Sequence, residues 1–155
     1  MRILKIGNCP SLSGNSNLTY NIGHSDQGDL HFQLHANTGG GLFSRQWIPF
    51  MAIEGLLEGN ITGRTLKPLY EGKSINSPGF VLAILLYENL VRPGSKGYIK
   101  SDFGPFKAAV QKLIDAGVDL KSQAEQAATS NKEVVGNEEP SATTTETTKP
   151  KKRRK

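Results

Sequence analysis

Two stretches that alternate apolar and polar side chains decide the fold: LTYNI at residues 18–22 and LHFQLH at residues 30–35. A period of two is typical of a strand with one buried face. The residues between them, 23–29, are rich in types that tolerate turns, so the sequence predicts an antiparallel hairpin. We expect residues 42–48, which follow a glycine-rich turn, to form a third strand, and residues 1–6 to supply a fourth.

The pattern changes to a helical period after residue 48. Pro49 suits a first helical position, and Phe50, Ile53, Leu56 and Leu57 share one face before Gly59. A second helical stretch is expected around 65–71. The most apolar helix begins with Ser77 as N-cap and Pro78 at its first position, and it ends before Pro93. Residues 98–100 fit a short strand, and 105–116 fit a last helix with Phe106, Ala109, Val110 and Leu113 inward and Gly117 after its end. The predicted class is α+β, with an antiparallel sheet of three to four strands followed by three helices.

Charge and apolar side chains are unevenly distributed along the 155 residues, which carry a formal net charge of +5. Residues 1–120 hold 11 Lys and Arg against 9 Asp and Glu, residues 121–148 hold 2 against 5, and residues 149–155 hold 6 against none. All aromatic residues lie between positions 20 and 106. We therefore expect an α+β globular domain at 1–120, a disordered acidic and threonine-rich linker at 121–148, and a basic terminal segment at 149–155.

Composition excludes several classes of protein. The single cysteine, Cys9, rules out an internal disulfide framework and a cysteine-rich zinc module, and it indicates a reducing, intracellular compartment. The N-terminus has no apolar stretch of signal-peptide length. The longest apolar run, residues 80–87, is far shorter than the roughly 20 residues that span a bilayer. We expect a soluble protein, cytoplasmic or nucleoid-associated in a bacterium, or nuclear if the basic terminus acts as an import signal.

The sequence offers few groups for catalysis. The Gly72-Lys73-Ser74 triplet resembles the end of a phosphate-binding loop, but position 67, where that motif needs glycine, is Lys67, so we expect a polar turn between helices. His31 and His35 on one strand lie about 13 Å apart, too far to share a metal ion. Nothing places Cys9 beside a histidine base. We predict a protein that is not an enzyme, with no metal and no cofactor.

The expected third strand carries an aromatic and cationic pattern. Phe43, Arg45 and Trp47 alternate with polar residues and therefore share one face of such a strand. On an exposed face, Arg45 and Trp47 could stack on bases. On a buried face, which the pattern favours, Phe43 and Trp47 belong to the core and Arg45 lies at its rim.

Residues 50–101 resemble a winged helix-turn-helix. Helices are followed by the basic, glycine-containing stretch VRPGSKGYIK at 91–100, and the most similar part is 77–92. In that family the helix before the wing enters the major groove, and cations of the wing hold phosphates. The resemblance implies DNA contacts by Lys73, Ser74, Asn76, Arg92, Lys96 and Lys100. The residues alone fit equally well a helix that is only the hydrophobic centre of an α+β domain.

A second resemblance and the C-terminus both point to DNA. The stretches at 14–23 and 37–48 are similar to small uncharacterised proteins of bacterial mobile elements, which implies a DNA-related setting. The terminal cations can neutralise several phosphates without regard to sequence, and they also resemble a nuclear import signal. These cations are Lys149, Lys151, Lys152, Arg153, Arg154 and Lys155. We predict a DNA-binding protein with largely non-specific phosphate contacts; the alternative is a protein-interaction adaptor or effector whose basic terminus directs nuclear import.

Overall fold

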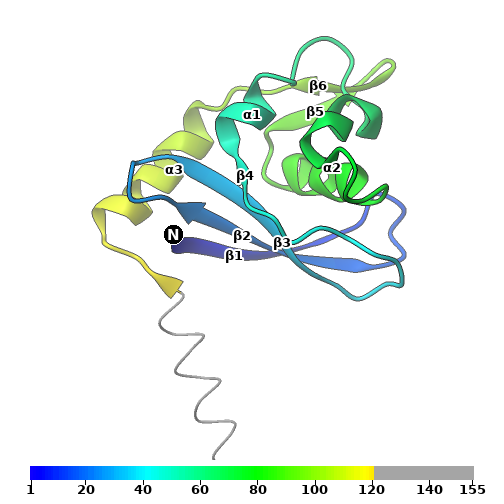
Figure 1. Cartoon of the computed structure of the whole chain (residues 1–155). Coiled ribbons are helices and arrows are strands. Elements are labelled where there is room, and N and C mark those ends of the chain that lie inside the picture. The colour runs from blue at the N-terminus through cyan, green and yellow to red at the C-terminus, as the bar shows by residue number, and fades with distance from the viewer. Residues whose placement is uncertain (121–155) are drawn as a thin grey trace, which may run out of the picture.

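The computed structural model describes residues 1–120 and has an α+β fold (Figure 1). A four-stranded antiparallel sheet has the order β1-β2-β3-β4, and a separate hairpin pairs β5 with β6. The strands are β1 (Arg2–Pro10), β2 (Asn17–His24), β3 (Leu30–Asn37), β4 (Ile48–Pro49), β5 (Val91–Gly94) and β6 (Gly97–Lys100). The helices are α1 (Phe50–Glu54), the 3₁₀ helix η1 (Gly63–Tyr70), α2 (Ser77–Tyr87) and α3 (Gly104–Asp115).

The predicted hairpin is confirmed and forms the centre of the sheet. β2 pairs antiparallel with β3, placing Ile22 opposite Phe32, and β1 pairs with the other edge of β2. The connecting turn is closed by the Ser25 amide, which donates to the carbonyl of Asp29 at 2.9 Å. Gly28 adopts a φ of +96° in this turn, a conformation that glycine reaches without strain.

The prediction of a strand over residues 42–48 is wrong, because β4 covers only Ile48–Pro49. The backbone before it is held by contacts with the helical layer instead of by a strand ladder. The Ser44 amide donates to the Ser77 hydroxyl at 2.9 Å, and the Gln46 side-chain amide donates to the carbonyl of Leu69 at 2.7 Å. Such bonds satisfy polar groups that a strand would otherwise pair with its neighbour.

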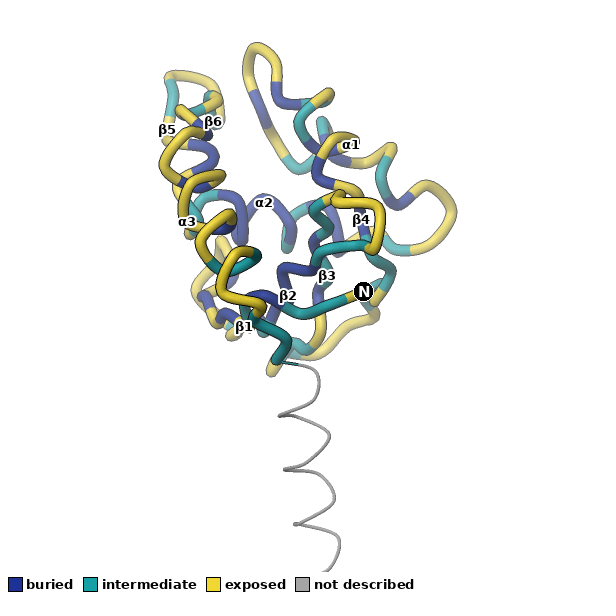
Figure 2. The backbone as a smooth tube through the Cα atoms, turned by 90° about the vertical axis from the view of Figure 1, so that its left-hand side faces the viewer, coloured by how far each residue is buried: buried dark blue, intermediate teal, exposed yellow. Residues whose placement is uncertain are grey.

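The core lies on one face of the sheet, beneath the helices (Figure 2). Phe32 of β3 stacks on Phe106 of α3 with ring centroids 5.9 Å apart, and Phe50 of α1 lies 5.7 Å from Phe32. These rings join three elements that are distant in sequence. Aromatic packing of this kind adds to the stabilisation from buried apolar area.

The helix α2 is the most apolar element and is buried along residues 77–78 and 81–85. Ser77 does not cap it as predicted: Asn76 occupies the N-cap position, and the Ser77 hydroxyl accepts from Ser44. The helix ends in a Schellman motif, in which the Leu90 amide donates to Leu85 and the Asn89 amide donates to Leu86. Asn89 has a φ of 59°, which asparagine tolerates better than most residues.

Two other predicted helices are corrected in detail. α1 is shorter than expected, and Leu56 lies beyond its end and is only half-buried. In α3, Phe106 and Val110 face the core, but Ala109, predicted to face inward, is exposed. Gly117 follows α3 with a φ of +67°, as predicted for a residue just past a helix end.

The predicted linker at 121–148 and the basic terminal segment at 149–155 lie outside the described residues. Within residues 1–120, no helix is long and apolar enough to cross a membrane.

Candidate nucleic-acid interface

The hairpin that resembles the wing of a winged helix-turn-helix forms directly after α2. β5 and β6 pair antiparallel, with Arg92 opposite Ile99, and the hairpin is tied to the fold where Tyr98 and Ile61 exchange backbone hydrogen bonds of 2.7 and 2.8 Å. Arg92 and Lys96 are exposed on it. Lys100 faces a different environment, since its ammonium lies 4.0 Å from a carboxylate oxygen of Glu54 and 4.7 Å from the ring centroid of Phe103.

Residues 38–47 form a loop, in which Phe43, Arg45 and Trp47 do not share one face as they would on a strand. The Arg45 guanidinium lies over the Phe43 ring, 5.6 Å from its centroid, and Phe43 packs against the edge of the core. Trp47 is half-buried and covers Gly23, where a Cβ would come within 2.7 Å of the indole. Since Ile22 faces the core, Gly23 and therefore Trp47 lie on the opposite face of the sheet. Arg45 and Trp47 do not form one stacking surface.

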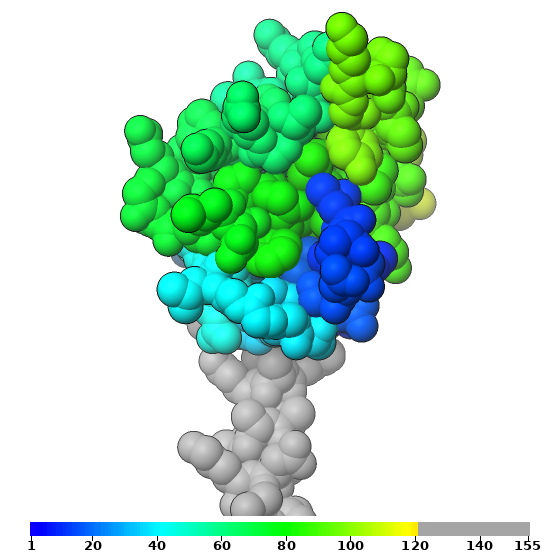
Figure 3. Space-filling model, turned by 90° about the vertical axis from the view of Figure 1, so that its right-hand side faces the viewer, coloured from blue at the N-terminus to red at the C-terminus, as the bar shows by residue number. Residues whose placement is uncertain are grey.

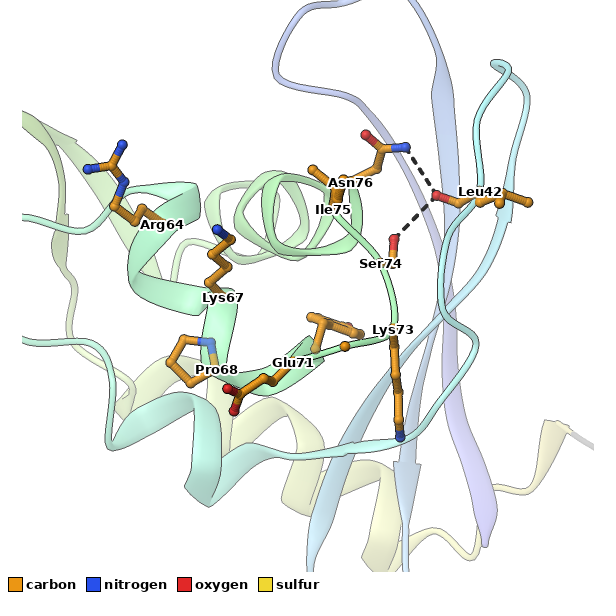
Figure 4. A pocket seen from close by; sticks show the side chains of 11 residues that line it. Leu42, Arg64, Lys67, Pro68, Glu71, Lys73, Ser74, Ile75 and Asn76 are labelled. Atoms are coloured by element: carbon orange, nitrogen blue, oxygen red, sulfur yellow. Dashed lines mark hydrogen bonds between the residues drawn. The ribbon is translucent and has the colours of Figure 1, made fainter.

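A pocket of about 870 Å³ opens beside η1. Its walls come from η1, from the turn at residues 71–76 and from Leu42 of the long loop (Figure 4). This volume lies within the range of small-molecule sites, about 300–1,000 Å³. The Gly72-Lys73-Ser74 triplet forms part of this turn, as predicted, with the Lys73 amide donating to the carbonyl of Tyr70 at 3.0 Å and Gly72 at a φ of +73°.

The geometry of η1 places its cations together at the pocket. In a 3₁₀ helix, side chains three residues apart lie above one another. Arg64, Lys67 and Tyr70 form such a row, and all three line the pocket. Figure 4 shows the charged ends of Arg64 and Lys67 on the same side of η1, while the carboxylate of Glu71 points the other way.

Hydrogen bonds hold the two walls of the pocket together. The Ser74 hydroxyl and the Asn76 side-chain amide both donate to the carbonyl of Leu42, at 3.3 and 3.1 Å (Figure 4). The Lys73 ammonium donates to the side-chain oxygen of Gln46 and is directed away from Arg64 and Lys67. These bonds hold the loop and the turn against each other.

Tyr70 contributes an unusual group to the pocket wall. Its side chain is 2% exposed, and its hydroxyl is shielded from solvent without a hydrogen-bond partner among the described residues. Burial raises the pKa of this phenol well above its usual range, so the hydroxyl keeps its proton. Buried polar groups are normally paired, and an unpaired one calls for a physical explanation.

Three of the eleven cations of residues 1–120 form ion pairs with described carboxylates; of the other eight, Arg2, Arg45 and Lys112 lie outside the pocket and the hairpin. Lys5, Lys100 and Lys107 each lie within 4.0 Å of a carboxylate oxygen. Around the pocket and on the hairpin, by contrast, five cations form no ion pair with any described carboxylate. We call them the cationic face: Arg64, Lys67, Lys73, Arg92 and Lys96.

The two segments that carry the cationic face lie on one side of the molecule. Figure 3 shows the segment from η1 to the start of α2 (green) beside the hairpin (yellow-green, upper right), above the loop that precedes β4 (cyan). The pocket has one carboxylate, Glu71, against three cations, so its lining is positive. Such a surface attracts anions.

A second cluster of polar groups is buried at the C-terminal end of α2. Glu88 accepts hydrogen bonds from the Tyr20 hydroxyl and from the Lys5 ammonium, the latter at 2.6 Å. Cys9 is buried nearby, and burial together with the negative charge of Glu88 raises the pKa of its thiol to about 11. A neutral thiol is a poor nucleophile, so this cluster ties the sheet to α2 and does not activate Cys9.

Among residues 1–120, no group of three or more His, Cys, Asp or Glu side chains is placed to hold a metal ion. His31 and His35 both lie on β3, as predicted. The His31 ring nitrogen Nδ1 lies 3.1 Å from the carbonyl of Asp29 at the hairpin turn.

The structure brings together residues that sequence reasoning missed. Arg64 and Lys67 were not among the predicted contacts, although the spacing Arg-x-x-Lys-x-x-Tyr over residues 64–70 is the signal that could have found them in a 3₁₀ helix. Ser74 and Asn76, implied by the winged-helix resemblance, are occupied with the carbonyl of Leu42. The helix before the hairpin, α2, is largely buried and offers little polar surface for reading bases.

Comparison of the chain with protein-family models, with curated proteins and with solved structures finds no match.

Proposed function

We propose that this protein binds DNA mainly through its phosphates, using the cationic face of the folded domain and the basic segment at 149–155. The observation that carries the proposal is that exposed cations without carboxylate partners lie on the pocket lining and on the hairpin, two segments that share one face in Figure 3. Lysine and arginine that are free of ion pairs remain available to replace the counterions of a phosphate backbone.

The hairpin acts as the wing in this proposal. Arg92 and Lys96 are exposed on a short antiparallel ribbon that projects from the body, and backbone pairing with Ile61 fixes its base. A rigid hairpin with two cations positions a protein on a duplex without reading its sequence. Because α2 is buried, the proposal assigns no base readout to it.

The terminal segment adds six cations within seven residues. Each phosphate that it neutralises adds about 0.9 to the magnitude of the slope of log affinity against log salt concentration. The folded domain alone has nearly equal numbers of cations and anions, so net charge is not what attracts DNA to it. The arrangement of the cations on one face supplies the local positive potential.

The test compares variants that change the same amount of charge in different places. Arg92→Gln/Lys96→Gln removes two charges from the hairpin, and Lys107→Gln/Lys112→Gln removes two from α3. Binding of a fluorescein-labelled 20-base-pair duplex is followed by anisotropy at low salt. We expect the hairpin variant to bind about tenfold more weakly than the α3 variant.

Equal loss in the two double variants would show that only total charge matters, and it would contradict a role for the cationic face. No binding by the full-length protein would contradict the proposed function itself. Circular dichroism of each variant serves as the control for folding.

A second function, protein binding, is favoured by a different observation. Leu42 and Ile75 line the pocket and are 87% and 89% exposed, an unusual degree for large apolar side chains. Exposed apolar side chains that form a contiguous patch mark surfaces of protein contact. If the protein is an adaptor, we expect the double variant Leu42→Ser/Ile75→Ser to lose capture of its partner protein while its affinity for duplex DNA stays unchanged.

A further inference from the structure

The pocket beside η1 combines a positive end with an apolar end. We propose that it binds an unpaired nucleotide, with the phosphate at Arg64 and Lys67 and the base against Leu42 and Ile75. This inference rests on the proposed function and deepens it, because it makes single-stranded DNA the preferred substrate over duplex.

The phosphate end is set by the 3₁₀ geometry. Arg64 and Lys67 stand one above the other on η1, point to the same side and have no carboxylate partner among residues 1–120. Two adjacent cations can hold one phosphate with charge-assisted hydrogen bonds. Glu71 points away from them, which keeps its negative charge off the phosphate.

The base end is set by the loop and the turn. Leu42 and Ile75 are highly exposed yet both belong to the pocket lining. Asn76 and Ser74 donate to the backbone carbonyl of Leu42, which holds the loop against the turn that carries Ile75. An apolar surface of this kind gains by covering the face of a base, which every nucleotide offers.

Tyr70 supplies the second, independent indication of a ligand. Its hydroxyl is buried and unpaired in the free protein, although the residue lines the pocket. Because this hydroxyl is shielded from solvent, a ligand in the pocket reaches it only when the side chains that cover it move, and the ligand then offers an acceptor that the described residues do not.

An unpaired nucleotide fits these groups better than a base pair does. A base inside a duplex is covered on both faces by its neighbours and cannot enter a pocket without leaving the stack. The cavity of about 870 Å³ accommodates one nucleotide and leaves the remaining strand outside, along the cationic face. The phosphate would be held by side chains of η1 and not by the Gly72-Lys73-Ser74 backbone, so the site differs from a phosphate-binding loop.

The test compares two DNA probes and one small molecule. Arg64→Gln/Lys67→Gln is measured against Lys107→Gln/Lys112→Gln, which removes the same charge from α3. The DNA probes are a labelled thymidine 8-mer and a labelled 20-base-pair duplex, and binding of both is measured by anisotropy. Binding of thymidine monophosphate is measured by calorimetry. We expect the pocket variant to lose at least about tenfold in affinity for the 8-mer and less than about threefold for the duplex.

The outcomes separate this inference from the function on which it rests. Selective loss of 8-mer binding supports a nucleotide within a strand, and loss of measurable monophosphate binding supports a free nucleotide in the same pocket. Equal weakening of 8-mer and duplex without monophosphate binding, or no change in either, would overturn the inference and leave the proposed function intact. If wild-type protein binds none of the three, the proposed function fails as well.

Tyr70→Phe is a second variant that should not impair folding, since the hydroxyl it removes has no partner. We expect the affinity of this variant for the 8-mer to fall about threefold, because the ligand loses a hydrogen-bond donor. Its melting temperature should be unchanged or higher, because the buried hydroxyl that is removed has no partner in the free protein. Unchanged affinity for the 8-mer and for the monophosphate would count against the pocket as the site.

Discussion

Gly7 on β1 provides the space in which the Tyr20 ring lies. A Cβ at position 7 would come within 2.3 Å of Cζ of Tyr20, and Tyr20 is fully buried where it donates its hydrogen bond to Glu88. We predict that Gly7→Ala lowers the free energy of unfolding by about 1–3 kcal/mol, because the ring or the strand must shift. Urea denaturation measures this. Gly40→Ala, where a Cβ meets nothing within 4 Å, is the matched control and should change stability by less than about 0.5 kcal/mol.

Cys9 makes stability depend on pH in the alkaline range. Its pKa rises from 9.0 to about 11 on folding, so the folded state holds the proton more tightly than the unfolded state. The stabilisation is complete below about pH 9 and is lost as pH rises through about 11. We predict that the free energy of unfolding, measured by urea titration, falls between pH 9 and 10 in the wild type and falls less in Cys9→Ala. The same slope in both proteins would contradict this explanation.

At the scale of elements, Ser77 joins the long loop to α2. Its hydroxyl accepts from the Ser44 amide at 2.9 Å, and the side chain is fully buried. Ser77→Ala leaves that amide without an acceptor, which costs about 1–3 kcal/mol of the free energy of unfolding. The exposed Ser95→Ala on the hairpin should have almost no effect, within about 0.5 kcal/mol. Thermal denaturation of the two variants checks the difference, and similar melting temperatures would refute it.

Elements with strong local periodicity were predictable from sequence. The strands of the central hairpin alternate around a turn-rich segment, and α2 carries a long apolar run, so both were correct in kind. The segment at 42–48 alternates too, yet its polar groups bond to Ser77 and Leu69, which lie in other elements. Tertiary hydrogen bonds of this type leave no local pattern, and the strand prediction therefore failed there.

The candidate site was less predictable than the fold. Arg92, Lys96 and Lys73 were expected from their place in the sequence, and the structure leaves all three exposed without a carboxylate partner among residues 1–120. Arg64 and Lys67 are three residues apart, which makes them neighbours in an α-helix as well, but the 3₁₀ helix at residues 63–70 also aligns Tyr70 with them. In an α-helix, with 3.6 residues per turn, each further step of three residues would rotate the side chain away from the first member of the row.

At the scale of the whole molecule, charge is distributed in a way that the net value conceals. The total of +5 is smaller than the six positive charges of residues 149–155 alone, so the remainder of the chain is slightly acidic. The folded domain nevertheless presents a side on which cations lack carboxylate partners, and its acidic residues other than Glu71 lie outside the pocket lining. The DNA binding that we propose would therefore be a local property of one face and one terminal segment.

The central claim is that the cationic face and the terminal segment both act on phosphates. The most direct test is the salt dependence of duplex affinity, measured by anisotropy for the full-length protein and for a chain ending at residue 148. We predict that truncation reduces the magnitude of the slope of log affinity against log salt by up to about 5, while weaker, salt-dependent binding by the folded domain remains. Equal slopes for the two chains, or no binding by the full-length protein, would contradict the claim.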